Sequence, residues 1–185
     1  MRVELIQATP NPIEFIARIA GICYDKEDTT TPEKRFMHLF NNGHLSTFEH
    51  VYYTFKIEGI SRACLAQLTR HRHASYTVRS QRYCNESDMD YVVPDDILNN
   101  ELLDKVYQDT IASAYHAYDY LIDCGVKKED ARFILPQAST TDLYISMNLR
   151  ELIHIYELRT SKTAQWEIRD LVNEMVSLVV GRETR

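Results

Sequence analysis

Residues 70–82 bring together side chains that bind anions. They read RHRHASYTVRSQR, with four arginines, two histidines and two serines, and no carboxylate among them. A guanidinium group can bind phosphate through two parallel hydrogen bonds, and the hydroxyl groups of Ser75 and Ser80 can donate to the same oxygens. Backbone N–H groups of a loop that point the same way add further donors. This stretch, called the arginine segment below, predicts a loop that binds a phosphorylated small molecule.

The charge around this segment is uneven in a chain of 185 residues whose net charge is -6. Residues 60–83 hold five arginines and no acid, whereas residues 85–104 hold seven acids and no base. A basic island in an acidic chain favours a small anionic ligand over a long polyanion. Two other interpretations stay open. One is a solvated basic surface, although such surfaces usually mix signs. The other is a nucleic-acid-binding module in which Tyr76 and Tyr83 stack on bases.

Elements that could position these residues follow from residue periodicity. Alternating, aromatic and β-branched residues predict strands at 2–8, 50–59 and 140–147. Helical spacing of apolar residues predicts helices at 13–24, 32–40, 61–72, 100–124, 127–136, 148–159 and 164–180. Thr31 is expected to cap the second of these helices, with Pro32 at its first position. Together the elements predict one α+β domain over residues 1–185, rich in helix, with a small, mostly antiparallel sheet.

The predicted helix at 148–159 carries polar residues at suggestive positions. At about 100° per residue, Arg150 and His154 share a polar face, and Asn148 and Arg159 share another edge. One helix could therefore present two polar edges to a ligand and remain packed. The apolar stripe between the edges is expected to consist of Leu149, Leu152, Ile153 and Tyr156. In the helix at 164–180, the buried face is expected to hold Ile168, Leu171, Val172, Met175 and Val179.

Cysteine and histidine positions indicate the setting of the protein. The four cysteines are widely spaced and form no CxxC pair, which favours a reduced, cytoplasmic protein without a disulfide framework. The histidine spacing matches no standard zinc pattern, so no metal is expected. No stretch approaches the roughly 20 apolar residues that a membrane span needs, so no membrane partner is expected.

Four short motifs in order carry a resemblance to a known family. Arg70-His71-Arg72, seven further residues and then Ser80 form an RHRx7S signature, and with it the chain resembles the flavin-dependent thymidylate synthases. The segments GHLSTFEH (43–50), ARFILP (131–136), NLRELIHIYELR (148–159) and AQWEIR (164–169) resemble the family in the same order. The resemblance covers the chain from about Ile19 to Arg169.

The resemblance implies a fold, a reaction and partners. It implies the thymidylate synthase-complementing fold and a methyltransferase that converts dUMP to dTMP. Methylenetetrahydrofolate is the expected carbon donor, and FAD reduced by NADPH is the expected hydride carrier. The family further implies a cytoplasmic homotetramer with active sites shared between subunits, and no nucleic-acid partner.

The resemblance also assigns site residues. Arg159 is the expected catalytic residue, because a guanidinium at the uracil carbonyl edge would stabilise negative charge on the ring as C5 becomes nucleophilic. A plain helix C-terminal cation is the alternative for Arg159. No enzyme nucleophile is required, and Cys84 receives no catalytic role. His44 is expected near the folate and flavin entrance. The expected dUMP-binding residues are Gln67, Arg70, Val78, Arg79, Ser80, Gln81, Arg82, Arg132 and Arg159. The expected FAD-binding residues are Ser46, Glu49, Arg70, His71, Arg72, Asn148, Arg150 and His154.

Two positions depart from the family pattern. Many members have an Asn–Glu pair where this chain has Thr77-Val78, so a carboxylate or amide contact must be lost or supplied elsewhere. Some members have a histidine where this chain has Thr163, which removes one flavin contact. These departures leave open a nucleotide- or flavin-binding protein of the same fold that has lost catalysis.

Overall fold

A computed structural model describes residues 1–26 and 30–183, with side chains described up to residue 181. Contacts within the chain divide it into two compact units. Unit 1 consists of Met1–Arg2, Glu58–Leu68 and Thr77–Leu143, and unit 2 of Val3–Ile57, Thr69–Tyr76 and Tyr144–Arg185. The single domain expected over residues 1–185 stays a prediction.

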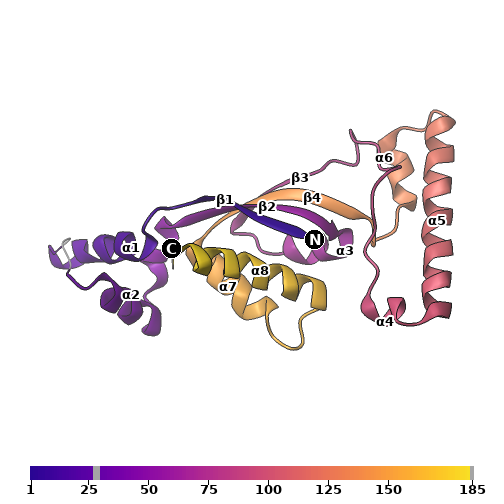
Figure 1. The fold of residues 1–185 in the computed structure, drawn as a ribbon. Helices are drawn as coiled ribbons and strands as arrows, with labels where there is room; N and C mark the ends of the chain where they lie inside the picture. Colours follow the sequence, from indigo (N-terminus) through magenta and orange to yellow (C-terminus); the bar gives the residue numbers. More distant parts are fainter. Residues whose placement is uncertain (27–29, 184–185) are drawn as a thin grey trace. The chain divides into compact units, whose positions relative to one another are not determined.

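The sheet has four strands in the order β1-β2-β4-β3, namely β1 (Arg2–Ala8), β2 (Tyr52–Ser61), β4 (Thr140–Asn148) and β3 (Ala74–Val78) (Figure 1). It is antiparallel, as predicted. Successive side chains of a strand point to opposite faces, and in β2 this alternation buries Tyr53, Phe55 and Ile57. Strand β3 is a correction, because it lies in the arginine segment that was expected to be a loop. Aromatic and β-branched residues at 76–78 favour the extended conformation.

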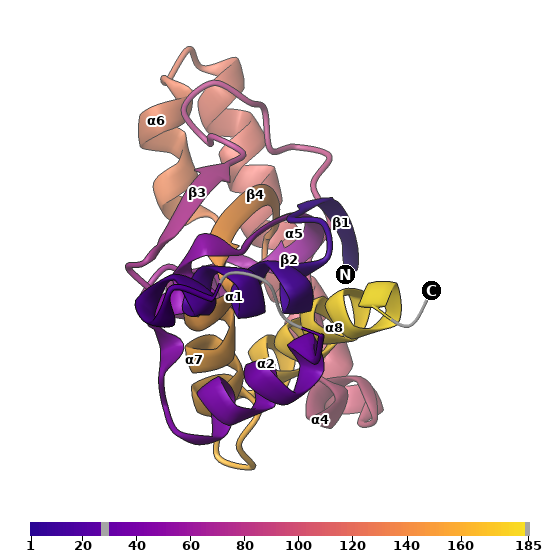
Figure 2. The same ribbon diagram turned by 90° about the vertical axis from the view of Figure 1, so that its left-hand side faces the viewer.

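Unit 2 contains helices α1 (Pro12–Gly21), α2 (Pro32–Asn41), α7 (Leu149–Arg159) and α8 (Trp166–Glu183), and the 3-10 helices η1 (Ile22–Tyr24) and η2 (Leu45–His50). Helix α1 packs on α2, and α7 packs on α8 and η2 (Figure 2). The predicted inner face of α8 is confirmed, since Ile168, Leu171, Val172, Met175 and Val179 are all buried. Thr31 occupies the N-cap position of α2, but its side chain makes no capping hydrogen bond there, contrary to expectation.

The apolar stripe predicted for α7 was partly wrong. The buried residues of this helix are Glu151, Leu152 and Ile155, whereas Tyr156 is 43% exposed. The packing of α7 between α8 and η2 decides which side faces inward, and this packing is not encoded in the periodicity of the helix alone. The burial of Glu151 marks a polar environment inside unit 2, described below.

Unit 1 contains helices α3 (Arg62–Leu68), α4 (Asp95–Leu98), α5 (Glu101–Asp123) and α6 (Lys128–Ala131), followed by the 3-10 helix η3 (Arg132–Ile134). The Asn100 side chain caps α5 by accepting hydrogen bonds from the N–H groups of Leu102 and Leu103, at 3.1 and 3.2 Å. Gly125 follows α5 with a φ of 83°, a conformation that favours glycine.

Helix α3 is shorter than predicted, because it ends at Leu68 and not at residue 72. Gln67 is therefore in the last turn of α3, whereas Arg70 lies beyond it in a turn. Tertiary contacts of His71, which belongs to unit 2, compete with the continuation of the helix. Among the described residues, no helix is both long enough and apolar enough to cross a membrane.

Candidate active site

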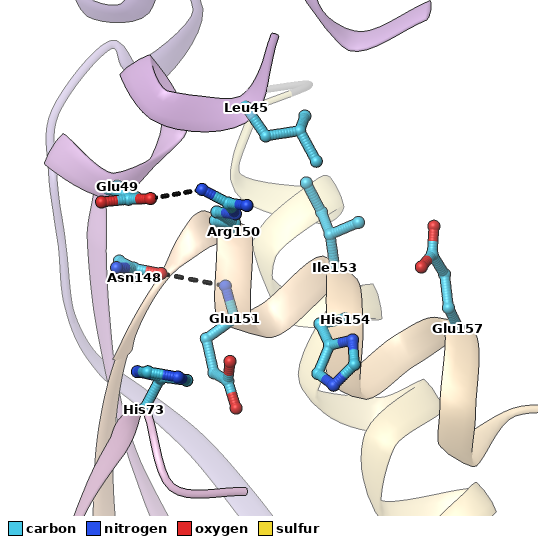
Figure 3. Close-up of a pocket in the computed structure, with 9 residues that line it drawn as sticks. All are labelled: Leu45, Glu49, His73, Asn148, Arg150, Glu151, Ile153, His154 and Glu157. Carbon is cyan, nitrogen blue, oxygen red and sulfur yellow. Dashed lines mark hydrogen bonds and ion pairs between the residues drawn. The ribbon is translucent and has the colours of Figure 1, made fainter. Parts of the chain in front are cut away.

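A cavity of about 580 Å³ in unit 2 collects four of the residues predicted to bind FAD (Figure 3). They are Glu49, Asn148, Arg150 and His154. Sequence reasoning missed the other residues that line the cavity, which are Leu45, His73, Glu151, Ile153 and Glu157. Of these, His73 lies inside the RHRx7S signature and could have been included for that reason.

The start of α7 positions the polar side of this cavity. The Oδ1 atom of Asn148 accepts a hydrogen bond from the N–H of Glu151 at 2.9 Å, so Asn148 is the N-cap of the helix. Arg150 and His154 are four residues apart in α7, so their side chains lie on the same side of the helix. The Nη1 atom of Arg150 lies 2.6 Å from Oε1 of Glu49, a residue of η2 (Figure 3). This ion pair fixes the direction of the Arg150 guanidinium at the cavity.

The last turn of α7 joins the signature through one hydrogen bond. The Nε–H of Arg159 donates to Nε2 of His71 at 2.9 Å. Because Nε2 is the acceptor, the proton of the neutral imidazole is on Nδ1, which lies 3.9 Å from Oε1 of Glu151. The catalytic residue expected from the sequence is therefore held by the central histidine of the signature.

His71 is neutral at physiological pH. It is 4% exposed. Burial is the main cause that lowers its pKa from 6.5 to about 4, and the nearby charges of Arg159 and His154 lower it further. The contact between His71 and Glu151 is consequently not an ion pair at neutral pH. The acceptor that His71 offers to Arg159 is therefore a neutral one.

Two neighbours fix the position of the His71 ring and backbone. The ring lies edge-on to that of His154, with centroids 6.1 Å apart, which places the Arg159–His71 pair beside the cavity that His154 lines. The hydroxyl of Tyr76 donates to the carbonyl oxygen of His71 at 2.9 Å. Burial, together with the charge of Glu151, raises the pKa of Tyr76 to about 12, so this hydroxyl stays a donor.

Other predicted residues of unit 2 lie outside this cavity. Ser46 and His44 line a second cavity of about 390 Å³, together with Cys23, Arg35 and His38 among others. Arg70 and Arg72 flank His71 in the turn after α3 and are exposed. Neither arginine is among the lining residues of the two cavities.

Unit 1 holds most of the predicted dUMP-binding residues. Gln81 and Arg132 line one cavity of about 280 Å³ with Arg62, which was not predicted. Arg82 and Arg132 are connected by Glu129. The carboxylate of Glu129 accepts from Nε of Arg82 at 2.8 Å, and its carbonyl oxygen accepts from Nε of Arg132 at 3.1 Å. The hydrogen bond from Arg82 is the main cause that lowers the pKa of Glu129.

Backbone hydrogen bonds shape the chain after β3. The carbonyl oxygen of Ser80 accepts from the N–H groups of Tyr83 and Cys84, at 3.2 and 2.9 Å. The N–H of Arg82 donates to Oγ of Ser80 at 3.3 Å, and that of Arg79 donates to the carbonyl oxygen of Asp142 at 2.9 Å. Two of the expected backbone donors, those of Arg79 and Arg82, are thus already hydrogen-bonded within unit 1.

The predicted dUMP set is therefore divided between the two units. Arg70 and Arg159 belong to unit 2. Unit 1 contributes Gln67, Val78, Arg79, Ser80, Gln81, Arg82 and Arg132. Within the part of the chain that the structure describes, no group of three or more His, Cys, Asp or Glu side chains is placed to hold a metal ion.

Comparison with known proteins defines the class. Residues 4–182 match the family described as thymidylate synthase complementing protein, and the chain belongs to this family. A flavin-dependent thymidylate synthase from Geobacter sulfurreducens is 42% identical over 195 residues, which cover 98% of this chain and 83% of the relative. One from Pyrococcus furiosus is 40% identical over 196 residues, covering 99% of this chain and 80% of the relative.

Solved structures give the same result. A crystal structure of thymidylate synthase X from Helicobacter pylori with FAD and dUMP has a TM-score of 0.75 and 26% sequence identity, covering 96% of this chain and 93% of that one. These matches confirm three predictions made from the sequence, namely the family, the helix-rich α+β fold and the class of enzyme.

Proposed function

We propose that this chain converts dUMP to dTMP, with methylenetetrahydrofolate as carbon donor and FAD reduced by NADPH as hydride carrier. Its curated relatives are flavin-dependent thymidylate synthases, and the Helicobacter pylori enzyme was solved with FAD and dUMP. The observation that carries the proposal is the 2.9 Å hydrogen bond that joins Arg159 to His71 of the signature, beside a cavity suited to a flavin.

The residues around the 580 Å³ cavity suit FAD in their chemistry. A flavin ring has wide apolar faces and a polar edge, and Leu45 and Ile153 offer an apolar surface next to the amide, guanidinium and imidazole groups of Asn148, Arg150 and His154 (Figure 3). When bound and reduced, FAD supplies the hydride. The residues that would hold it are Ser46, Glu49, Arg70, His71, Arg72, Asn148, Arg150 and His154.

The dUMP-binding residues act on two parts of the substrate. The phosphate is held by the guanidinium groups of Arg82 and Arg132 and by the Ser80 hydroxyl, with Gln67, Arg70, Val78 and Gln81 also in the site. Arg159 stabilises negative charge on the uracil ring, so that C5 can form a bond to the methylene carbon. C5 then loses its proton as the bond between the new carbon and the folate nitrogen breaks, and tetrahydrofolate leaves. A hydride from the reduced cofactor would then convert the new carbon to a methyl group. No enzyme nucleophile takes part.

The assembly proposed for the enzyme is a homotetramer with shared active sites, with His44 near the folate and flavin entrance and a location in the cytoplasm. A complementation experiment tests the shared sites. Arg82→Ala impairs the unit 1 part of the site and Arg159→Ala the unit 2 part. At a dUMP concentration that does not saturate Arg82→Ala, mixed oligomers should therefore form dTMP faster than either variant alone. If mixing under conditions that exchange subunits gives no increase, Arg82 and Arg159 of one active site come from the same subunit.

The function itself is tested by omission. Purified protein is incubated with dUMP, methylenetetrahydrofolate, NADPH and FAD, and dTMP is measured by chromatography. We expect dTMP with all four present and none when any one is left out. Protein that binds FAD and dUMP but forms no dTMP would instead be the catalytically inactive relative that the Thr77-Val78 departure left open.

The nucleic-acid-binding alternative gains nothing from the structure. Three arginines of the basic island face carboxylates within unit 1, in the pairs Arg62–Glu86 at 3.9 Å, Arg79–Glu86 at 3.3 Å and Arg82–Glu129 at 2.8 Å. Each pair removes positive charge that a polyanion would need. The absence of a nucleic-acid partner stays a prediction, which a salt titration of oligonucleotide binding tests.

A further inference from the structure

Two side-chain donors of Arg79 and its backbone N–H bind other parts of unit 1. Its Nε–H donates to Oε1 of Glu86 at 3.3 Å, and an Nη2 hydrogen donates to the carbonyl oxygen of Asn85 at 3.1 Å. Its backbone N–H donates to the carbonyl oxygen of Asp142 at 2.9 Å. Arg79 is also not among the residues that line the 280 Å³ cavity of unit 1. This arginine is therefore used to hold its own chain, in contrast to the role expected from the sequence.

Glu86 is the carboxylate at the centre of this arrangement. It is fully buried, and nothing in the sequence motifs assigns it a role. Its Oε2 atom lies 3.9 Å from Nη2 of Arg62, and the same nitrogen donates to the carbonyl oxygen of Arg79 at 3.3 Å. The backbone N–H of Glu86 donates to the hydroxyl of Tyr118, a buried residue of α5, at 3.4 Å. Glu86 thus ties the chain after β3 to α3 and α5.

These contacts flank three of the proposed dUMP-binding residues in the sequence. Ser80, Gln81 and Arg82 lie between Arg79 and Glu86, so both ends of the segment are fastened by one ion pair. Within the segment, the carbonyl oxygen of Ser80 accepts two backbone N–H groups. The segment from 79 to 86, called the signature loop below, therefore has a defined shape before any substrate binds.

The cluster is poorly suited to a role in stability alone. Oε2 of Glu86 and Nε of Arg62 are both buried without a hydrogen-bond partner among the described residues. Buried ion pairs often contribute little net stability, because the cost of removing charges from water offsets their attraction. Burial is also the main cause that lowers the pKa of Arg62. The negative charge of Glu86 raises this pKa, whereas the positive charges of Arg132 and Arg79 lower it. The presence of three charged groups here, those of Arg62, Arg79 and Glu86, is better explained by a need to fix the conformation of the loop.

We propose that Glu86 is a positioning residue for the substrate site, which acts through Arg79 and Arg62 to hold the signature loop in the shape that binds the phosphate of dUMP. The proposal rests on the proposed function. In this chain Thr77-Val78, at the end of β3, stands where many relatives have an Asn–Glu pair, and Glu86 supplies a carboxylate to the loop that follows this strand. Arg79 is then a partner of Glu86 and not a ligand of the phosphate.

The test compares Glu86→Gln with the double variant Arg79→Gln/Glu86→Gln in FAD-loaded protein. Binding of dUMP is measured by calorimetry, FAD content by absorbance, and folding by the thermal midpoint. We expect Glu86→Gln to weaken dUMP binding at least tenfold and to leave FAD content unchanged, because the residues that hold FAD are in unit 2. The double variant should bind dUMP about as weakly as Glu86→Gln, because the two residues act as one pair and the second substitution breaks no further contact. Glu58→Gln, which alters a glutamate that is 31% exposed and 3.7 Å from Arg2, is the control and should match the wild type.

Three outcomes would overturn the proposal. Glu86→Gln could bind dUMP like the wild type, in which case the carboxylate does not position the loop. The double variant could bind dUMP much more weakly than the single one, in which case the ligand needs Arg79 itself. Should Glu86→Gln fail to fold, the double variant decides alone, and a folded double variant that binds dUMP like the wild type contradicts the proposal. Failure of the wild type to bind dUMP would instead contradict the proposed function.

Discussion

Arg159 of unit 2 and Arg79 of unit 1 are held by different kinds of acceptor. In unit 2, Arg159 donates to a neutral imidazole, that of His71, which brings no negative charge to this contact. In unit 1, Arg79 donates to the buried carboxylate of Glu86, which cancels its charge and turns it into a structural contact. The choice of acceptor therefore separates an arginine suited to electrostatic catalysis from one suited to holding a loop.

The largest effect is expected from removing the guanidinium of Arg159. Arg159→Ala should lower kcat about a thousandfold, the order seen when one preorganised donor to a developing charge is lost. Arg159→Lys keeps the charge without the Nε–H that binds His71 and should recover part of the rate. Steady-state dTMP formation measures both. Lys162→Ala, an exposed cation three residues further on, is the control, and an equal loss there would contradict the special role of Arg159.

The neutrality of His71 predicts a pH dependence of stability. Its folded pKa of about 4 lies below the ordinary 6.5, so between these values the unfolded chain binds a proton that the folded chain does not. Stability should fall as the pH drops through this window, by roughly 2 kcal/mol at pH 5 relative to pH 7. The groups that face His71 are Arg159, His154, Glu151 and Tyr76.

His71→Gln tests this dependence, because glutamine offers a neutral acceptor that does not titrate. Urea unfolding at pH 7 and pH 5, at one protein concentration, should show a smaller acid loss in the variant than in the wild type. His116→Gln, at an exposed position of α5, should leave the wild-type loss unchanged. An acid loss in His71→Gln as large as that of the wild type would mean that His71 is not buried in its neutral form.

Two helix caps sharpen the contrast between the units. Asn100 caps α5 in unit 1, and Asn148 caps α7 at the edge of the unit 2 cavity. Alanine at either position should lower the free energy of unfolding by about 1 kcal/mol. Only Asn148→Ala should also weaken FAD binding, measured by fluorescence titration. Equal FAD affinity in both variants would remove Asn148 from the flavin site.

The smallest change in stability is expected at the exposed pair of unit 2. Arg150 and Glu49 are about half exposed, and such pairs contribute about 0–1 kcal/mol. Glu49→Gln should therefore leave the thermal midpoint nearly unchanged. Its FAD affinity should fall about tenfold, since Arg150 loses the contact that orients it. A variant that keeps full FAD affinity would show that the pair is only a surface contact.

Part of the fold and site could be predicted from the sequence, and the rest depends on contacts between distant residues. Helices α5 and α8 follow from long apolar periodicity and strand β4 from its β-branched and aromatic residues. The end of α3 and the inner face of α7 do not, since tertiary packing decides both. The neutral state of His71 could not be inferred either, because its pKa depends on burial and on Arg159, which is 88 residues away.

The ion cluster of unit 1 was also missed, although a signal for it existed. The acidic run begins with Glu86, directly after the arginine segment, and Glu86 folds back onto Arg79 and Arg62. A sharp change from basic to acidic residues can thus indicate that the two runs face each other in the fold. The same holds for Glu129, which reaches Arg82 from the start of α6.

The division of labour between the units is tested most directly by measuring dUMP affinity and kcat side by side in Arg82→Ala and Arg159→Ala. If the loop of unit 1 grips the phosphate and Arg159 acts on the uracil ring, Arg82→Ala should weaken dUMP binding at least tenfold and keep most of kcat at saturation. Arg159→Ala should keep its dUMP affinity within about threefold and lose turnover. If both variants lose dUMP affinity and kcat in the same proportion, the proposed separation of phosphate binding by unit 1 from catalysis by Arg159 is contradicted.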